Sequence, residues 1–257
     1  MKKIIVFFIL SLLTANAFAK CGASGIWVFP AGPTIKQNSL ILLNGYEQSQ
    51  GIILGLNKKY PVYLQSGEKK VKLIVREICT GEFRMTQALL APEEQLEAGL
   101  EYTLQFDSVA GFKTLSQWNY ETGANETVKW KVTAGTDDSK PVFRAMPKEI
   151  KKTLVHYGCG PAMYVIFSCD IKDDSECLVR TTVKNLTSGK TTTYYLETQS
   201  RVKQLKIGHG MCSGAFDFDK NSVYEVSFDL VDASGNTSSW TGDKIKFSPP
   251  ATETAEE

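Results

Sequence analysis

Histidine is scarce in this sequence: His156 and His209 are the two present among 257 residues. Because histidine is the usual general base near neutral pH and a frequent metal ligand, most acid–base and metal chemistries lack their ordinary group here. The formal net charge of +1 gives the chain no electrostatic attraction for nucleic acid or anionic membranes. With 42% hydrophobic and 22% charged residues, the composition is that of a folded globular protein.

Long hydrophobic runs are also lacking after residue 19. Residues 1–19 have the pattern of an export signal: positive residues 2–3, an apolar stretch over residues 4–13, and the small residues of Ala17-Phe18-Ala19. An apolar stretch of about ten residues is too short to cross the roughly 30 Å hydrocarbon core of a bilayer. We expect cleavage after Ala19, a secreted or periplasmic protein, and no remaining membrane span.

The six cysteines are an even number, as expected of a protein in an oxidising compartment. Lys20 stands before Cys21 where bacterial lipoproteins carry a small residue, so we expect no lipid anchor. A domain boundary near residue 138 would place two cysteines on one side and four on the other. This pairs Cys21 with Cys79, and among the other four we favour Cys169–Cys177 across a hairpin and Cys159–Cys212 over a longer loop.

Alternation of apolar and polar residues predicts strands along most of the chain. Three examples are the apolar sets of residues 71–75, 128–132 and 224–230, each interleaved with charged or polar side chains. Such strands have one buried and one solvated face, as antiparallel sandwiches require. Helical patterning is weak, and Pro92 to Leu100 is the one stretch where we predict a short helical turn. The sequence predicts an all-β protein.

A polar stretch over residues 136–141 interrupts the strand pattern and ends in proline, which is typical of a linker. It divides the chain into a first domain (residues 20–138) and a second domain (residues 139–248). The remaining residues, 249–257, are predicted to be a short disordered acidic tail.

A spacing of i, i+3, i+6 occurs once in each predicted domain, just before a strand. An apolar residue is followed by one that tolerates a left-handed backbone and then by a tyrosine. The sets are Leu96, Gly99 and Tyr102, and Phe218, Asn221 and Tyr224. This resembles the tyrosine corner of immunoglobulin-like sandwiches, in which the hydroxyl binds backbone upstream.

The same regions resemble bacterial immunoglobulin-like and fibronectin-like modules, such as those of surface-layer and copper-resistance proteins. The resemblance rests on residues 90–104, on the exit through residues 131–141, and on residues 230–238, which are similar to an F–G hairpin. It implies two tandem antiparallel β-sandwich domains and says little about function. Copper-binding members use histidine near the mature N-terminus, and residues 20–25 contain none.

Each histidine stands three residues before a cysteine, which raises the possibility of a metal site. His156 with Cys159 and His209 with Cys212 would form a Cys₂His₂ zinc site, or a copper site joined by Met211. Zinc needs thiolates, whereas exported proteins keep cysteines oxidised. The preferred interpretation is a disulfide flanked by two loop histidines, with no metal and no cofactor.

Acidic residues occur in two patterns that only weakly indicate calcium sites. Residues 217–221 have the D-x-D-x-N spacing of an EF-hand loop, but Ser222 and Phe228 stand where its glycine and glutamate belong. Asp137 and Asp138 of the linker are the second candidate. We favour solvated turns in both places.

Catalytic motifs are absent: there is no G-x-S-x-G elbow and no glycine-rich phosphate loop. Aromatic pairs form possible ligand platforms at Trp118 with Tyr120 and at Tyr194 with Tyr195. We assign Trp27 and Trp130 to the core. Residues 191–195 are a plausible exposed strand edge for a partner strand.

These patterns favour an exported, non-enzymatic protein with a binding, structural or adhesion role at the cell surface or envelope. Its partner would be a protein or a glycan, with no nucleic acid. Two alternatives remain: a periplasmic zinc- or copper-binding protein that uses the two histidines, and a carbohydrate-binding accessory module.

Overall fold

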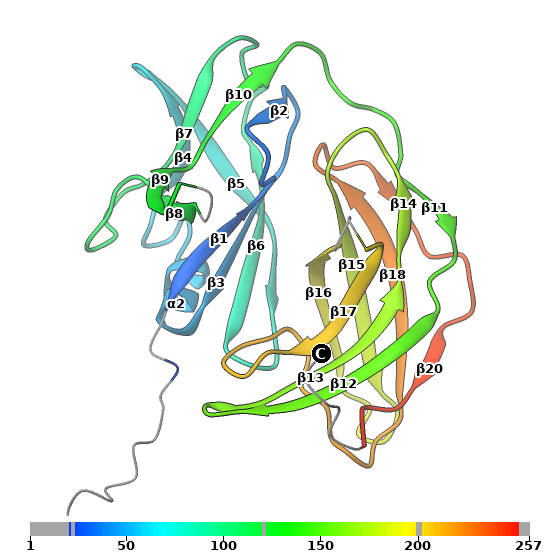
Figure 1. Ribbon diagram of the computed structural model, residues 1–257. Coiled ribbons are helices and arrows are strands. Elements are labelled where there is room, and N and C mark those ends of the chain that lie inside the picture. Colours follow the sequence, from blue (N-terminus) through cyan, green and yellow to red (C-terminus); the bar gives the residue numbers. More distant parts are fainter. Residues whose placement is uncertain (1–20, 22–23, 120–121, 199–201, 252–257) are drawn as a thin grey trace, which may run out of the picture.

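A computed structural model of the chain describes residue 21 and residues 24–119, 122–198 and 202–251 (Figure 1). The predicted export signal and most of the acidic tail lie outside the described residues. The regular structure is almost entirely β, which confirms the predicted class.

The helical turn predicted at Pro92–Leu100 is wrong, because Pro92 ends a strand and turns follow it. The helices described are a 3₁₀ turn at Glu47–Ser49 and α2 (Gln50–Leu54), and no helix in this part of the chain is long and apolar enough to cross a membrane.

One eight-stranded sheet forms the first half of the molecule. Its order is β1 (Gly25–Phe29), β3 (Ile41–Tyr46), β6 (Met85–Pro92), β5 (Lys69–Thr80), β4 (Val62–Ser66), β7 (Glu101–Phe106), β10 (Lys129–Thr133) and β2 (Thr34–Lys36). Neighbours are antiparallel except β10 and β2. Side chains from both ends of this sheet, including Ile41, Leu104 and Trp130, share one hydrophobic cluster. The sheet is therefore folded over on itself, as in a sandwich.

Strand β5 connects the two layers and changes direction at a bulge. Its first residues pair with β4 and its later ones with β6, and the register shifts between Val75 and Glu77. A bulge inserts one residue and so exchanges the two faces of a strand. Before the bulge Val71 and Leu73 are buried in the core of the first half; after it Glu77 and Cys79 face the second half.

Two further sheets face each other across the core of the second half. One contains β12 (Glu149–Tyr157), β13 (Gly160–Ser168) and β17 (Gln204–His209); the other contains β16 (Thr191–Glu197), β15 (Cys177–Asn185) and β18 (Tyr224–Asp232), with β19 (Thr237–Ser238) and β20 (Ile245–Phe247) both paired to β18. Phe167 of the first sheet meets Phe228 of the second edge to face, with ring centroids 5.4 Å apart. A small pair, β11 (Val142–Ala145) and β14 (Asp170–Lys172), completes this half.

Both predicted tyrosine corners make the expected kind of contact. The Tyr102 hydroxyl accepts a hydrogen bond from the Glu97 N–H at 3.4 Å, and the Tyr224 hydroxyl accepts one from the Asp219 N–H at 2.7 Å. Gly99 adopts the left-handed backbone that it tolerates, with φ of 85°. Asn221 does not adopt it, since its φ is not positive.

The two halves pack closely through β16, which lies against the outer face of β5 and β6. The Gln87 side chain is fully buried there. Its amide donates to the Tyr195 carbonyl at 3.1 Å and accepts from the Tyr195 N–H at 2.6 Å. Arg180 donates to Glu77 at 2.8 Å. The hydrophobic cluster of the second half also includes residues of the first, Phe29, Leu42 and Leu89.

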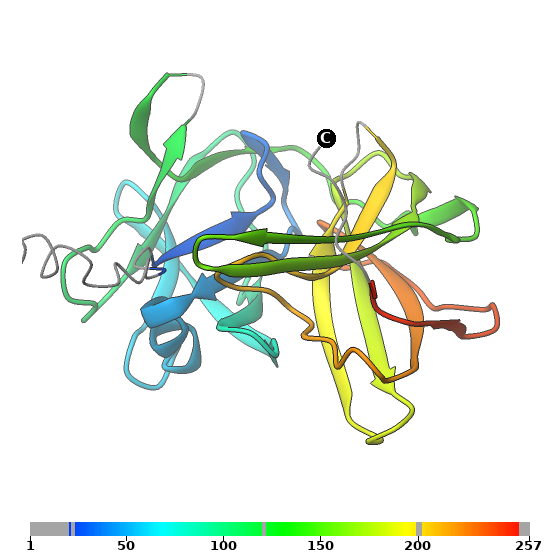
Figure 2. The ribbon, with the colours of Figure 1, turned by 60° about the horizontal axis from the view of Figure 1, so that its bottom comes forward.

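Two hairpins extend from this body. The long β12–β13 hairpin leaves the second half and reaches along the first, toward the start of β1 (Figures 1 and 2). The shorter hairpin of β8 (Ser116–Asn119) and β9 (Ala124–Thr127) projects from the first half (Figure 2).

Candidate functional site between the two halves

A groove with a volume of about 450 Å³ lies between the halves. Its floor is the outer face of β1, β3 and β6, where Trp27, Asn44 and Met85 line it. Its walls come from the second half, with Tyr164 of β13, Lys206 of β17 and the loop that follows β17. The groove exists because β16 covers only part of the outer face of the first half.

Trp27 is the most exposed aromatic residue of the groove, with 48% of its surface accessible. Its ring stacks on Tyr46, with centroids 4.4 Å apart and planes 19° apart. Ile26 and Val28 on either side are buried, so the alternation of β1 turns Trp27 outward. The prediction that Trp27 belongs to the core is therefore wrong. The same prediction for Trp130 is confirmed: it is 2% exposed, and its indole N–H donates to the Pro30 carbonyl at 3.0 Å.

Polar groups accompany the aromatic rings. The Tyr194 hydroxyl donates to Asn44 Oδ1 at 2.6 Å, which fixes the orientation of that amide. The Lys206 ammonium lies 5.7 Å from the centre of the Tyr164 ring. Gly208, beside them, has a φ of 144°, and a Cβ there would lie 1.9 Å from the Met163 carbonyl oxygen, so no larger residue fits.

Glu197 stands where this groove meets a second pocket. Its side chain is exposed, yet desolvation by the surrounding walls raises the pKa of Glu197, and the nearby Glu176 carboxylate raises it further. Glu176 itself is bound to the first half, since its oxygens accept hydrogen bonds from the N–H groups of Ala31 and Gly32 at 3.1 and 2.8 Å. Glu197 is thus the carboxylate available to a ligand at this end of the groove.

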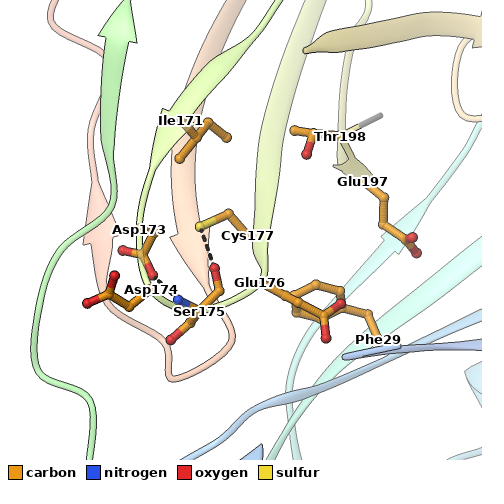
Figure 3. Close-up of a pocket in the computed structure, with 9 residues that line it drawn as sticks. All are labelled: Phe29, Ile171, Asp173, Asp174, Ser175, Glu176, Cys177, Glu197 and Thr198. Carbon is orange, nitrogen blue, oxygen red and sulfur yellow. Dashed lines mark hydrogen bonds between the residues drawn. The ribbon is translucent and has the colours of Figure 1, made fainter. Parts of the chain in front are cut away.

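The second pocket, of about 440 Å³, is strongly acidic (Figure 3). The loop of residues 173–176 lines one side of it, and Glu197 and Thr198 line the other. Beside it, Asp137, Asp173 and Asp232 offer carboxylate oxygens within 4.8 Å of one another.

The three aspartates of this cluster are held differently. Asp137 accepts hydrogen bonds from Ser139 and Ser175, which lower its pKa. Desolvation raises the pKa of Asp173, and the neighbouring carboxylates add to the effect. Asp232 is buried and already accepts backbone N–H groups of its own turn.

The two aspartates of the linker candidate lie in different surroundings: Asp137 is grouped with Asp173 and Asp232, whereas the Asp138 carboxylate accepts the Thr136 hydroxyl. Carboxylates are suitable ligands for a hard cation. Residues 217–221, the other calcium candidate, lead into β18; Asp217 contacts His209 there.

None of the three predicted disulfides is formed in the structure. Cys21 is bonded to Cys212, in the loop that follows β17 of the second half. Cys79 and Cys159 are therefore free thiols. The prediction failed because it assumed that no disulfide crosses the domain boundary, whereas Cys21–Cys212 does. Cys169 and Cys177, the third predicted pair, are also free thiols in the structure.

The predicted Cys₂His₂ set is not assembled. The His209 ring lies edge to face against Phe83, with Nδ1 2.8 Å from the Gly210 carbonyl oxygen and Nε2 3.4 Å from Asp217. Neither histidine joins the sulfur cluster that does form, which consists of Cys21, Cys159 and Cys212. A soft metal would need all three as thiolates, and two of them are bonded to each other.

The other predicted platforms have different environments. Tyr194 and Tyr195 are both buried, 1% and 5% exposed, because one face of β16 packs on its own core and the other on the first half. At the predicted partner-strand edge, residues 191–195, the Gln87 side chain binds the backbone N–H and carbonyl of Tyr195. Trp118 is 52% exposed on β8, and residue 120, its predicted partner, lies outside the described residues.

Comparisons with known proteins give distant structural matches and no family. No family model matches the chain, and no curated protein matches it. Among solved structures, a pullulanase from Anoxybacillus sp. LM18-11 shares 7% identity over 82% of this chain and 24% of that chain, with a TM-score of 0.24. The surface layer protein SbsC, domains 1–6, shares 13% identity over 87% of this chain and 34% of that chain, with a TM-score of 0.26. A cytokine receptor complex shares 9% identity over 89% of this chain and 97% of that chain, with a TM-score of 0.25.

This chain spans about a quarter of the length of the pullulanase chain. TM-scores this low carry no argument about fold or function. A function for this chain has to be inferred from the geometry of the groove.

Proposed function

We propose that the protein is an exported, non-enzymatic binding protein of the cell surface or envelope, and that the groove between its halves binds an oligosaccharide. The observation that carries this proposal is Trp27. A half-exposed indole stacked on Tyr46 presents a flat apolar face in a groove that also contains polar groups.

An oligosaccharide matches this combination because a sugar ring has an apolar face and a rim of hydroxyl groups. The indole face would stack on the ring, while Asn44, Lys206 and Glu197 would donate to and accept from the hydroxyls. Ligand sites commonly combine aromatic walls with a few placed polar groups of this kind. Because residues of both halves line the groove, it would accept a chain of several sugars.

The non-enzymatic character rests on what the groove offers to a bound glycan. Glycoside hydrolysis usually needs two carboxylates on opposite sides of the scissile bond. Among the described residues that line the groove, Glu197 is the one carboxylate. Cys212, which also lines the groove, is bonded to Cys21 and offers no nucleophile.

The scaffold we propose consists of two tandem immunoglobulin-like sandwiches, residues 20–138 and 139–248. Two separate hydrophobic clusters and the two hydrogen-bonded tyrosine corners support this division. In such scaffolds binding sites lie in loops and between domains, which is where the groove is found.

The test is calorimetric titration of a panel of oligosaccharides against the wild type and two matched variants. Trp27→Ala removes the indole of the groove, and Trp118→Ala removes a similarly exposed indole from the β8–β9 hairpin. We expect Trp27→Ala to weaken binding by about 2 kcal/mol, roughly thirtyfold in Kd, and Trp118→Ala to leave it unchanged. Equal losses in the two variants, or binding that does not need Trp27, would contradict the proposed site. Binding of peptides but of no glycan would show that the ligand class is wrong.

A further inference from the structure

Three sulfur atoms meet at the loop that follows β17. The Sγ atoms of Cys21, Cys159 and Cys212 all lie within 4.8 Å of one another. Cys21 and Cys212 form a disulfide, with Cα atoms 5.5 Å apart, and Cys159 is a free thiol. All three residues are partly exposed. A free thiol beside a disulfide is the arrangement from which thiol–disulfide exchange proceeds.

The sheet of the second half holds Cys159 beside Cys212. Strands β13 and β17 are antiparallel and pair Met163 with His209. Cys159 lies four residues before Met163, and Cys212 lies three residues after His209. Because the strands are antiparallel, both cysteines follow the same end of this strand pair. The close approach persists at Gly160, where a Cβ would lie 3.5 Å from the Met211 carbonyl oxygen. Cys21, in contrast, comes from the segment before β1.

We propose that these residues form a thiol–disulfide exchange site in which Cys159 takes over the bond to Cys212 and releases Cys21. The Cys159 thiolate attacks Sγ of Cys212, a new S–S bond forms between them, and the bond from Cys21 to Cys212 breaks. Cys21 leaves as a thiolate and takes up a proton. One disulfide and one thiol are present before and after the step, so no oxidant or reductant is consumed.

The exchange changes what the disulfide connects. The bond from Cys21 to Cys212 joins a residue of the first half to the second half, across 191 residues of sequence. The bond from Cys159 to Cys212 lies within the second half and leaves Cys21 without a covalent link to it. The site therefore switches a covalent link between the two halves on and off, and it does so whether or not the groove binds a glycan.

The other three thiols provide an internal reference. Burial raises the pKa of Cys79, Cys169 and Cys177 to about 12 in each case. These thiols stay protonated near neutral pH, and only thiolates attack disulfides. We expect them to take no part in the exchange while the protein is folded.

The experiment follows the position of the free thiol over time. Oxidised wild-type protein is held at about pH 8.5, where an ordinary thiol is half ionised, then quenched with acid at intervals and alkylated. Digestion uses trypsin and then chymotrypsin, because no Lys or Arg separates Cys159 from Cys169. We expect the label first on Cys159 and later also on Cys21, together with a Cys159–Cys212 cross-linked peptide.

Variants decide whether Cys159 is responsible. In Cys159→Ser the label on Cys21 should be lost, whereas Cys79→Ser should behave as the wild type does. Cys21→Ser, refolded in an oxidising glutathione buffer, should form the Cys159–Cys212 bond. The proposal is overturned if the wild-type label stays on Cys159 alone, if Cys21 is labelled equally fast in Cys159→Ser, or if Cys21→Ser leaves Cys159 and Cys212 both reduced.

Discussion

Trp27 shows where residue-level prediction stops. It lies in a run of four apolar residues, Ile26 to Phe29, and a continuous apolar run does not reveal which face of a strand is buried. Where apolar and polar residues alternate, as around Trp130, the buried face was predicted correctly. The residue that carries the proposed function could be found only once β1 was placed at the edge of its sheet.

Gln87 gives a stability prediction at the same scale. Gln87→Ala removes both hydrogen bonds to the Tyr195 backbone and leaves a buried N–H and carbonyl without partners. We expect the free energy of unfolding to fall by about 2–3 kcal/mol, measured by urea denaturation. Gln65→Ala, which removes an exposed hydrogen bond to the Gly67 carbonyl, is the matched control and should cost less than about 1 kcal/mol. Equal effects would mean that the buried amide does not join the halves.

Replacing Asp173 should raise the stability of the protein, whereas replacing Gln87 should lower it. Desolvation raises its pKa, and the charges of Asp232 and Asp137 raise it further, so its ionised form is disfavoured in the folded protein. Asp173→Asn should therefore stabilise the protein at pH 7, by less than about 1 kcal/mol. The gain should disappear in thermal denaturation below pH 3.8, the ordinary pKa of an aspartate, where wild-type Asp173 is protonated in both the folded and the unfolded state. A loss of stability at pH 7 would instead indicate that the carboxylate is needed there, for example by a cation.

Elements were predicted best where spacing and turn chemistry agree. The i, i+3, i+6 spacing led to both tyrosine corners because it depends on local geometry. The bulge in β5 left no comparable signal, and it reverses which residues of that strand face inward. The position of Glu77 and Cys79 in the contact between the halves could not be inferred from alternation alone.

The two corners should differ in strength. The Tyr224 hydroxyl accepts a 2.7 Å bond from Asp219 N–H and a second from the Asn185 amide, whereas Tyr102 accepts a longer bond of 3.4 Å. We expect Tyr224→Phe to lower the free energy of unfolding by about 1–2 kcal/mol and Tyr102→Phe by about 0.5–1 kcal/mol. Chemical denaturation of the two variants in parallel measures the difference, and the reverse order would contradict the assigned hydrogen bonds.

At the scale of the whole molecule, the contact between the halves was the least predictable feature. Treating the chain as two independent domains led to the wrong partner for Cys21, because Cys21 is bonded to Cys212 of the second half. Tyr194 and Tyr195 were a candidate ligand platform, yet both rings are buried because the two halves cover opposite faces of β16. Interfaces of this kind depend on how two folded surfaces meet, which no local pattern encodes.

The contact between the halves should weaken in acid. Burial alone would raise the pKa of Glu77, but the hydrogen bonds from Arg180 and Tyr195 outweigh it and hold the pKa below 4.5, the ordinary value for a glutamate. The stabilisation that the ionised Glu77 carboxylate contributes is therefore present above pH 4.5. It is lost as the pH falls through the lower pKa that Glu77 has in the folded protein. In Glu77→Gln the difference from the wild type should shrink over that range, as measured by thermal denaturation at each pH. Glu101→Gln, which breaks an exposed ion pair with Lys129, should differ little from the wild type throughout.

The groove as a glycan site is tested most directly by an NMR titration of the four tryptophan indoles. Trp27 lies in the groove, Trp118 on the projecting hairpin, Trp130 in the core of the first half, and Trp240 against the core of the second. Each indole N–H gives its own signal in a ¹⁵N-correlated spectrum. With a bound oligosaccharide, we predict a saturable shift of the Trp27 signal while the other three stay in place. A saturable shift at Trp118 alone, or shifts at none of the four when binding is seen by calorimetry, would contradict the groove as the binding site.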